Sequence, residues 1–140
     1  MPGEPQIKRT YAFIDGQNLF YAVKEAFGYG YPNYDPLALA KAVCQTQNWI
    51  LTKVFIYTGV PDERDKPAWN YFWNKKLAFM GTRGIVTYSR PLKYRNQHIK
   101  LNDGTFVTTP VGQEKGIDIR IALDVVRMAL RKEYDIALNF

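Results

Sequence analysis

The sequence predicts an α/β domain in which a mostly parallel sheet carries helices on both faces. Short apolar runs rich in β-branched and aromatic residues alternate with segments whose apolar residues recur at helical spacing. Chains with this alternation build strand–helix–strand units, whose helices cover both faces of the parallel strands. The length of 140 residues corresponds to one domain. We expect that domain to occupy residues 10–140, after a tail of residues 1–9.

The first third of the chain predicts one strand and two helices. Residues 11–14 form a short apolar run that is typical of a buried strand. Residues 19–27 follow with helical spacing and stop at Gly28, a residue type that readily ends helices. Asp35 is the expected cap of the second helix, because its side chain can accept from free backbone N–H groups and a proline follows it.

The middle of the chain predicts a strand, a helix and a further strand. Residues 50–60 are rich in β-branched and aromatic side chains, which favour a strand. A helix is expected to begin near Pro67 with Asp65 as its cap, and residues 84–92 form the next strand. The helix carries an aromatic and apolar stripe that we interpret as core packing. The stripe consists of Trp69, Phe72, Trp73, Leu77 and Met80.

The last third predicts a hairpin, a long helix and a final strand. Two short β-type runs within residues 98–107 are joined by Asn-Asp-Gly at 102–104, which is a hairpin turn sequence. Residues 116–132 repeat apolar side chains at helical spacing. Residues 134–140 are apolar enough to form another buried strand.

The composition limits the classes of function. The net charge of +6 suits an anionic partner, and nucleic acid is the commonest one. No stretch is long and apolar enough for a membrane-spanning helix, and the first residues lack the apolar core of a signal peptide. The single cysteine, Cys44, lies in an apolar run and is expected to be a buried thiol. A cytoplasmic location fits these features.

A polar segment follows the first strand, at the end of a parallel sheet where ligands bind in such folds. It contains Asp15, Asn18 and a glycine, Gly16, that would allow a tight turn. A carboxylate there needs a helix N-terminus, a basic side chain or a metal as its partner. Asp118 lies in the first turn of the late helix, where an acid also interacts favourably with the helix dipole, and Glu114 precedes it. Two carboxylates and an amide that converge would suit a magnesium ion.

Other candidates for chemistry are weaker. Asp124 lies about 240° round the helix from Asp118, so it is either a buried carboxylate with a structural partner or a solvated one. The single histidine, His98, is expected to be an exposed strand residue. No phosphate-binding loop or dinucleotide glycine motif is present, which argues against a phosphatase-like or nucleotide-binding domain.

Basic residues cluster on and before the predicted hairpin, with aromatic residues among them. Such a combination can follow a single-stranded nucleic acid backbone and stack its bases. The alternative is a solvated hairpin with ordinary charged edge residues. The basic residues are Arg90, Lys93, Arg95 and Lys100.

Two segments together resemble the NYN domain, in the LabA-like group of PIN-like nucleases. They are YAFIDGQNLF at 11–20 and EKGIDIRIALDVVRMALRKEYDIAL at 114–138. The resemblance implies a three-layer α/β/α PIN-like fold with a mostly parallel sheet, here with an inserted hairpin, and RNA cleavage that depends on Mg²⁺ or Mn²⁺. It implies that Asp15 and Asp118 are carboxylates of the metal site with Asn18 beside them. Asp124 falls on a commonly acidic position and is a second-tier candidate.

The family pattern continues past residues 134–140 with an acidic loop, a helix and a strand, which we expect to be missing here. The metal site would then have fewer carboxylates, and the last strand would be a poorly covered edge that favours homodimers. The first hypothesis is therefore a metal-dependent ribonuclease domain that hydrolyses RNA phosphodiester bonds. The alternative is a non-catalytic RNA-binding or protein-interaction module with the same fold.

Overall fold

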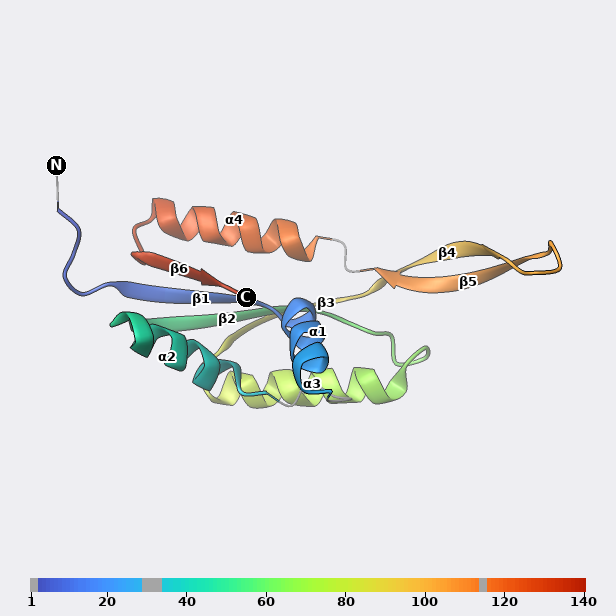
Figure 1. The fold of residues 1–140 in the computed structure, drawn as a ribbon, viewed down its shortest axis with the longest axis horizontal. Coiled ribbons are helices and arrows are strands. Elements are labelled where there is room, and N and C mark those ends of the chain that lie inside the picture. The colour runs from blue at the N-terminus through green and yellow to red at the C-terminus, as the bar shows by residue number, and fades with distance from the viewer. Residues whose placement is uncertain (1–2, 29–33, 114–115) are drawn as a thin grey trace.

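A computed structural model describes residues 3–28, 34–113 and 116–140, without the side chains of residues 93–95 and 109–113. Strands and helices alternate along the chain (Figure 1). The elements are β1 (Arg9–Asp15), α1 (Gly16–Phe27), α2 (Pro36–Gln47), β2 (Ile50–Val60), α3 (Pro67–Thr82), β3 (Val86–Pro91), β4 (Lys93–Lys100), β5 (Phe106–Gln113), α4 (Ile117–Leu130) and β6 (Ile136–Asn139). Four strands form a parallel sheet of order β3-β2-β1-β6, and β4 and β5 form a separate antiparallel hairpin.

Each face of the sheet has its own apolar core, because successive side chains of a strand point to opposite faces. In β1, Ala12 and Ile14 pack in the core that includes residues of α1, α2 and α3. Tyr11 and Phe13 pack in the other core, together with Ile117 of α4. Figure 1 shows α4 on one side of the sheet and α2 and α3 on the other. The predicted α/β architecture with helices on both faces is confirmed.

The aromatic stripe of α3 is core, as predicted. Trp73, Leu77 and Met80 are buried, and Trp69 and Phe72 pack against the same cluster.

The single cysteine is buried, as the sequence predicted. Cys44 is buried on the inner side of α2, and burial raises the pKa of its thiol. The interpretation of Cys44 as a buried structural thiol is therefore confirmed.

The helix ends show where local prediction succeeded and where it failed. Asp35 caps α2, and its side chain accepts from the backbone N–H groups of Leu37 and Ala38. The prediction that Asp65 caps α3 was wrong, since Lys66 occupies the cap position and no side chain caps the helix. Pro67 begins α3 without a cap because its fixed φ already suits the first helical turn.

The carboxyl-terminal strand is less buried than predicted. Residues 134–140 were expected to form a buried strand, but β6 is only partly buried because it is the edge of the sheet, paired with β1 alone among the described strands. The outward face of α4 is exposed as well. It carries Ile119, Leu123, Val126 and Leu130. Association through this region stays a prediction.

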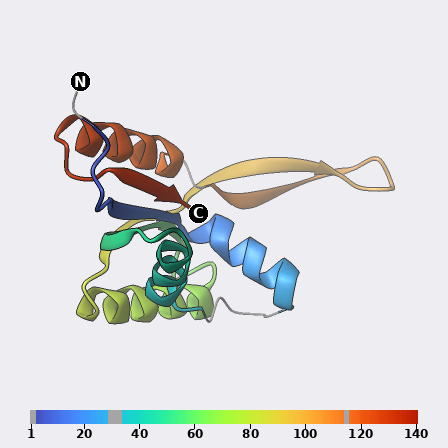
Figure 2. The same ribbon diagram turned by 60° about the vertical axis from the view of Figure 1, so that its left-hand side comes forward.

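The hairpin β4–β5 projects from the body as an arm in both ribbon views (Figures 1 and 2). Among the described strands, β4 and β5 pair only with each other, and Gly104 makes the turn at a φ of 89°. Phe106 is 67% exposed on this arm. The predicted hairpin is confirmed. Within the described residues, no helix has the length and apolar character needed to cross a bilayer.

Candidate active site

Asp15 is at once the last residue of β1 and the N-terminal cap of α1, so the strand passes into the helix without a loop. Its Oδ1 accepts hydrogen bonds from the backbone N–H groups of Gln17 at 3.1 Å and Asn18 at 3.2 Å. The Asp15 side chain is buried at the carboxyl end of the strand. One partner of this carboxylate is therefore a helix N-terminus, the first of the three partners that the sequence left open.

Gly16 allows the start of α1 to lie close to β2. The tight turn predicted for this glycine is not observed. Gly16 is the first residue of α1, and its φ is not in the left-handed region. A Cβ at this position would lie 3.1 Å from the Cβ of Thr58 and 3.2 Å from the carbonyl oxygen of Tyr57. The glycine thus lets α1 start directly against β2, which fixes the place of the preceding carboxylate.

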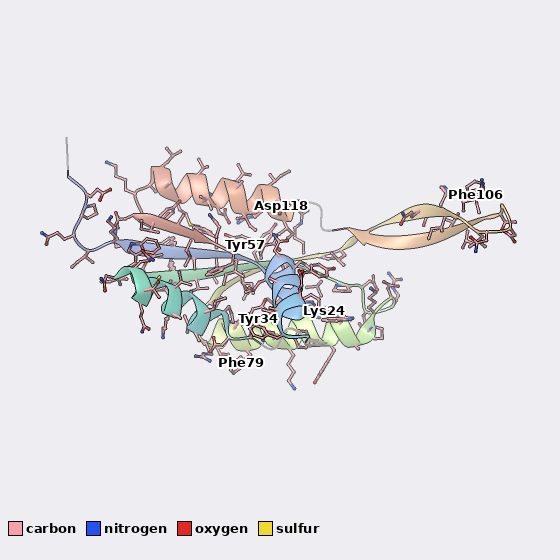
Figure 3. All side chains as sticks on the ribbon, viewed as in Figure 1. Lys24, Tyr34, Tyr57, Phe79, Phe106 and Asp118 are labelled. Atoms are coloured by element: carbon pink, nitrogen blue, oxygen red, sulfur yellow. The ribbon has the colours of Figure 1, made fainter. Side chains whose placement is uncertain are left out.

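Asp118 lies in the first turn of α4 (Figure 3). It lines the same cleft as Asp15. The pKa of Asp15 is raised, first because burial disfavours its ionised form. The backbone N–H groups of Asn18 and Gln17 oppose this effect, and the nearby Asp118 carboxylate adds to it. The structure therefore brings the two predicted carboxylates together.

A cleft of about 510 Å³ joins these residues. Its polar lining consists of Asp15, Asn18, Asp118 and Asn139. The rest of the lining is apolar and comes mainly from α4, together with Phe13 and Phe140. The cleft thus has two carboxylates at its mouth and an apolar wall. Next to such a wall, interactions between charges are stronger than in bulk water.

The donor set of this cleft fits a hard divalent cation. Asp15 and Asp118 offer carboxylate oxygens and Asn18 an amide oxygen, which are the ligand types of Mg²⁺. Two adjacent carboxylates repel each other, and a cation between them would reverse that effect. No group of three or more His, Cys, Asp or Glu gathers within the described ranges, but Mg²⁺ is often held by one or two carboxylates and its own waters. Glu114 lies outside the described residues.

Asp124 is buried in a separate network on the other side of α4. Its Oδ2 accepts from the Tyr57 hydroxyl at 2.9 Å. The Nε of Arg120 donates to both carboxylate oxygens at 3.1 and 3.0 Å, and Arg127 donates to Oδ1. Burial is the largest influence on the pKa of Asp124 and raises it, but the hydrogen bonds from Arg120, Tyr57 and Arg127 outweigh burial, so the pKa is lowered.

Of the two alternatives for Asp124, the structure shows the buried carboxylate with structural partners. Both of its oxygens already accept hydrogen bonds, and it does not line the cleft. The structure therefore does not bring Asp124 to the other metal candidates.

The basic candidates are spread between the sheet edge and the arm. Arg90 lies near the end of β3, and Lys100 is exposed on β4 opposite Phe106. The side chains of Lys93 and Arg95 lie outside the described part of the chain.

The lone histidine of the chain is exposed on the arm. The Nδ1 of His98 lies 3.0 Å from the Thr108 hydroxyl, a cross-strand hydrogen bond. It is an exposed strand residue, as expected.

Sequence reasoning missed a stacked pair between α4 and β3. The guanidinium of Arg120 lies over the ring of Tyr88, with its central carbon 4.5 Å from the ring centroid. The i, i+4 spacing of Arg120 and Asp124 on a helix is a usable signal for their ion pair. Nothing local indicates that Tyr88 of β3 would join it, because β3 and α4 meet only through the tertiary fold.

The sequence model of the NYN domain family matches residues 9–138. The chain belongs to the NYN domain family. Membership implies a nuclease-like function related to RNA. The matched range of this NYN domain contains Asp15, Asn18 and Asp118, together with all four strands of the parallel sheet but for the last residue of β6. Comparisons with curated proteins and with solved structures found no match.

Proposed function

We propose that this NYN domain is a ribonuclease that hydrolyses RNA phosphodiester bonds at the acidic cleft with Mg²⁺ or Mn²⁺. One observation carries the proposal: Asp15 and Asp118 face the same cleft, and neither forms an ion pair with any described residue. A pair of like charges without an internal counter-charge is suited to an external cation.

The residues of the cleft take distinct roles in this proposal. Asp15 and Asp118 hold the cation, and Asn18 orients a water or ligand beside them. When bound, the ion would polarise a phosphate oxygen and favour the deprotonation of an attacking water. The backbone N–H groups of Gln17 and Asn18 fix the orientation of the Asp15 carboxylate before any ligand arrives. Such preorganisation favours catalysis because little reorganisation remains for the reaction.

A cleavage assay on labelled single-stranded RNA tests this proposal. We expect Asp15→Asn and Asp118→Asn each to lower the rate by about 10³-fold, the effect of losing several kcal/mol of metal-dependent stabilisation. Asparagine is also a good helix cap, so Asp15→Asn keeps the start of α1 intact. Asp65→Asn is the matched control, since Asp65 is exposed on a loop and does not line the cleft. Full activity of the Asp15→Asn protein contradicts the assignment.

The second candidate is a non-catalytic RNA-binding module. It is favoured by the small donor set, because only two carboxylates line the cleft within the described residues. This candidate predicts RNA binding that persists in EDTA and weakens steeply with salt. Binding without cleavage in either Mg²⁺ or Mn²⁺ selects it over the ribonuclease.

A further inference from the structure

A strip of arginine and tyrosine side chains lies between β3 and α4, on the side of α4 that faces away from the acidic cleft. Arg120 of α4 stacks on the Tyr88 ring, where the negative face of the ring attracts the cation. Tyr88 in turn contacts Tyr57, with ring centroids 5.8 Å apart. Tyr88 and Arg90 are two residues apart on β3 and share one face of the strand. Gly116 and Arg120 are four residues apart and share one side of α4.

Positive charge exceeds negative charge within this strip. Arg120 and Arg127 both pair with Asp124, so two guanidinium groups share one carboxylate. Arg90 has no carboxylate partner among the described residues. Elsewhere, each of three arginines pairs with its own aspartate. They are Arg9, Arg64 and Arg83. Internal pairing therefore leaves the strip with an excess of cations.

The guanidinium of Arg90 lies against Gly116, just before the first residue of α4. Its Nη1 lies 2.7 Å from the position that a Cβ on Gly116 would take, and Gly116 has a φ of +88°. The positive φ favours glycine there, whereas the flexible end of the Arg90 side chain could move away from an added Cβ. The guanidinium thus lies against the backbone at the amino-terminal end of α4, where the helix dipole does not stabilise a cation. An external anion would stabilise a cation in this place.

We propose that Arg90 and Arg120 form a phosphate-binding subsite for the RNA strand that is cleaved in the acidic cleft. A guanidinium presents planar donors that match the oxygens of a phosphate. Asp124 binds the Nε of Arg120 and Tyr88 covers one face of its guanidinium, while 42% of the side chain stays exposed. Its orientation is therefore fixed before RNA binds. This subsite rests on the proposed function, since it takes RNA as the ligand.

The position of the subsite also indicates the path of the RNA strand across the protein. In the sheet order β3-β2-β1-β6, the acidic mouth lies at the end of β1 and Arg90 near the end of β3. After β3 the chain enters the arm, where Phe106 is exposed (Figure 3). Lys100 is exposed on the opposite strand of the arm. A strand that runs along the carboxyl edge of the sheet from the cleft towards the arm meets Arg90 and Arg120 on its way.

Equilibrium binding of a short labelled single-stranded RNA in EDTA tests the subsite without cleavage. We expect Arg90→Gln and Arg120→Gln each to raise Kd about tenfold, the effect of one charge-assisted contact. In the double variant, the slope of log Kd against log salt concentration should fall by about 1.4, because each phosphate contact to a single strand contributes about 0.7. A double variant with the parent Kd and the parent slope overturns the proposal.

Matched variants separate a local contact from a general effect of charge or folding. Arg64→Gln removes the same charge from a loop side chain that is 92% exposed, and we expect the parent Kd and slope. Tyr88→Phe keeps the ring under Arg120 and should keep the Kd, whereas Tyr88→Leu should raise it. Thermal unfolding of every variant confirms that the compared proteins are folded. Equal loss in Arg64→Gln and Arg90→Gln overturns the subsite.

The design also distinguishes this proposal from the ribonuclease assignment. A parent chain that binds RNA through both arginines but does not cleave it overturns the ribonuclease and leaves the subsite. A parent chain that cleaves, with unchanged KM in the arginine variants, overturns the subsite and leaves the ribonuclease. If both hold, KM rises in the arginine variants with little change in kcat, because the contact binds substrate and transition state alike. A parent chain with no measurable RNA binding overturns the subsite.

Discussion

Two carboxylates on α4 have opposite surroundings although they are of the same residue type on one helix. Asp118 is exposed in the first turn and shares a cleft with Asp15. Asp124 is buried and is held by Tyr57 and two arginines. At Asp124 the protein supplies the counter-charge itself, whereas at the cleft it places a second negative charge. The side of the helix on which a carboxylate lies therefore decides whether the protein itself supplies its counter-charge.

The pKa shifts follow the same division. Burial, with a contribution from Asp118, raises the pKa of Asp15. Three hydrogen bonds lower the pKa of Asp124 in spite of its burial. A cation in the cleft would act on Asp15 as the guanidinium groups act on Asp124. Three further experiments test these differences between the carboxylates and the packing that positions them.

The largest effect on stability is expected at Asp124. Asp124→Asn removes the charge that Arg120, Arg127 and the Tyr57 hydroxyl share, and we expect a loss of about 2–3 kcal/mol in the free energy of unfolding. Asp118→Asn should stay within about 0.5 kcal/mol of the parent, because Asp118 is exposed. Urea unfolding of both variants measures the difference. Equal stabilities would remove the distinction between the two carboxylates.

A smaller effect is expected where α1 starts against β2. A Cβ at Gly16 would meet Thr58 at 3.1 Å, so Gly16→Ala should destabilise the domain by about 1 kcal/mol. Gly81→Ala in α3 is the matched control, since nothing lies within 4 Å of its added Cβ. There the change should stabilise by about 0.5 kcal/mol, because alanine restricts the unfolded chain. Chemical denaturation of the pair tests the sign, and a stabilised Gly16→Ala protein contradicts the close approach.

The smallest effects are expected in the dependence of stability on pH. The folded chain holds a proton on Asp15 more tightly than the unfolded chain, so stability falls as pH rises from 3.8 through the raised pKa. Asp124 acts with the opposite sign: its contribution is complete above 3.8 and is lost as pH falls through its lowered pKa.

Urea unfolding across pH separates these two contributions. Asp15→Asn should remove its part of the decline in stability above 3.8, and Asp124→Asn should reduce, but not abolish, the loss on the acid side. An NMR titration that places the pKa of Asp15 below that of Asp124 refutes the assignment of signs.

The sequence by itself determined the elements, because the forces that start and end them act over a few residues. Asp35 and Gly28 mark helix ends as predicted, and residues 50–60 form β2 with the predicted bounds. The turn at 102–104 joins two strands. The stripe on α3 predicted core packing, and the alternation of strands and helices predicted helices on both faces of the sheet. Asp65 is the exception, because proline can begin a helix without a side-chain cap.

The sequence could also nominate Asp15 and Asp118, because parallel topology brings the end of a first strand and the start of a late helix to one edge. Only the tertiary structure decided what surrounds them. Gly16 faces Thr58, Arg120 lies on Tyr88, and Asp124 accepts from Tyr57. These contacts join residues far apart in the chain. They depend on strand order, register and the rotation of α4, which no local pattern encodes.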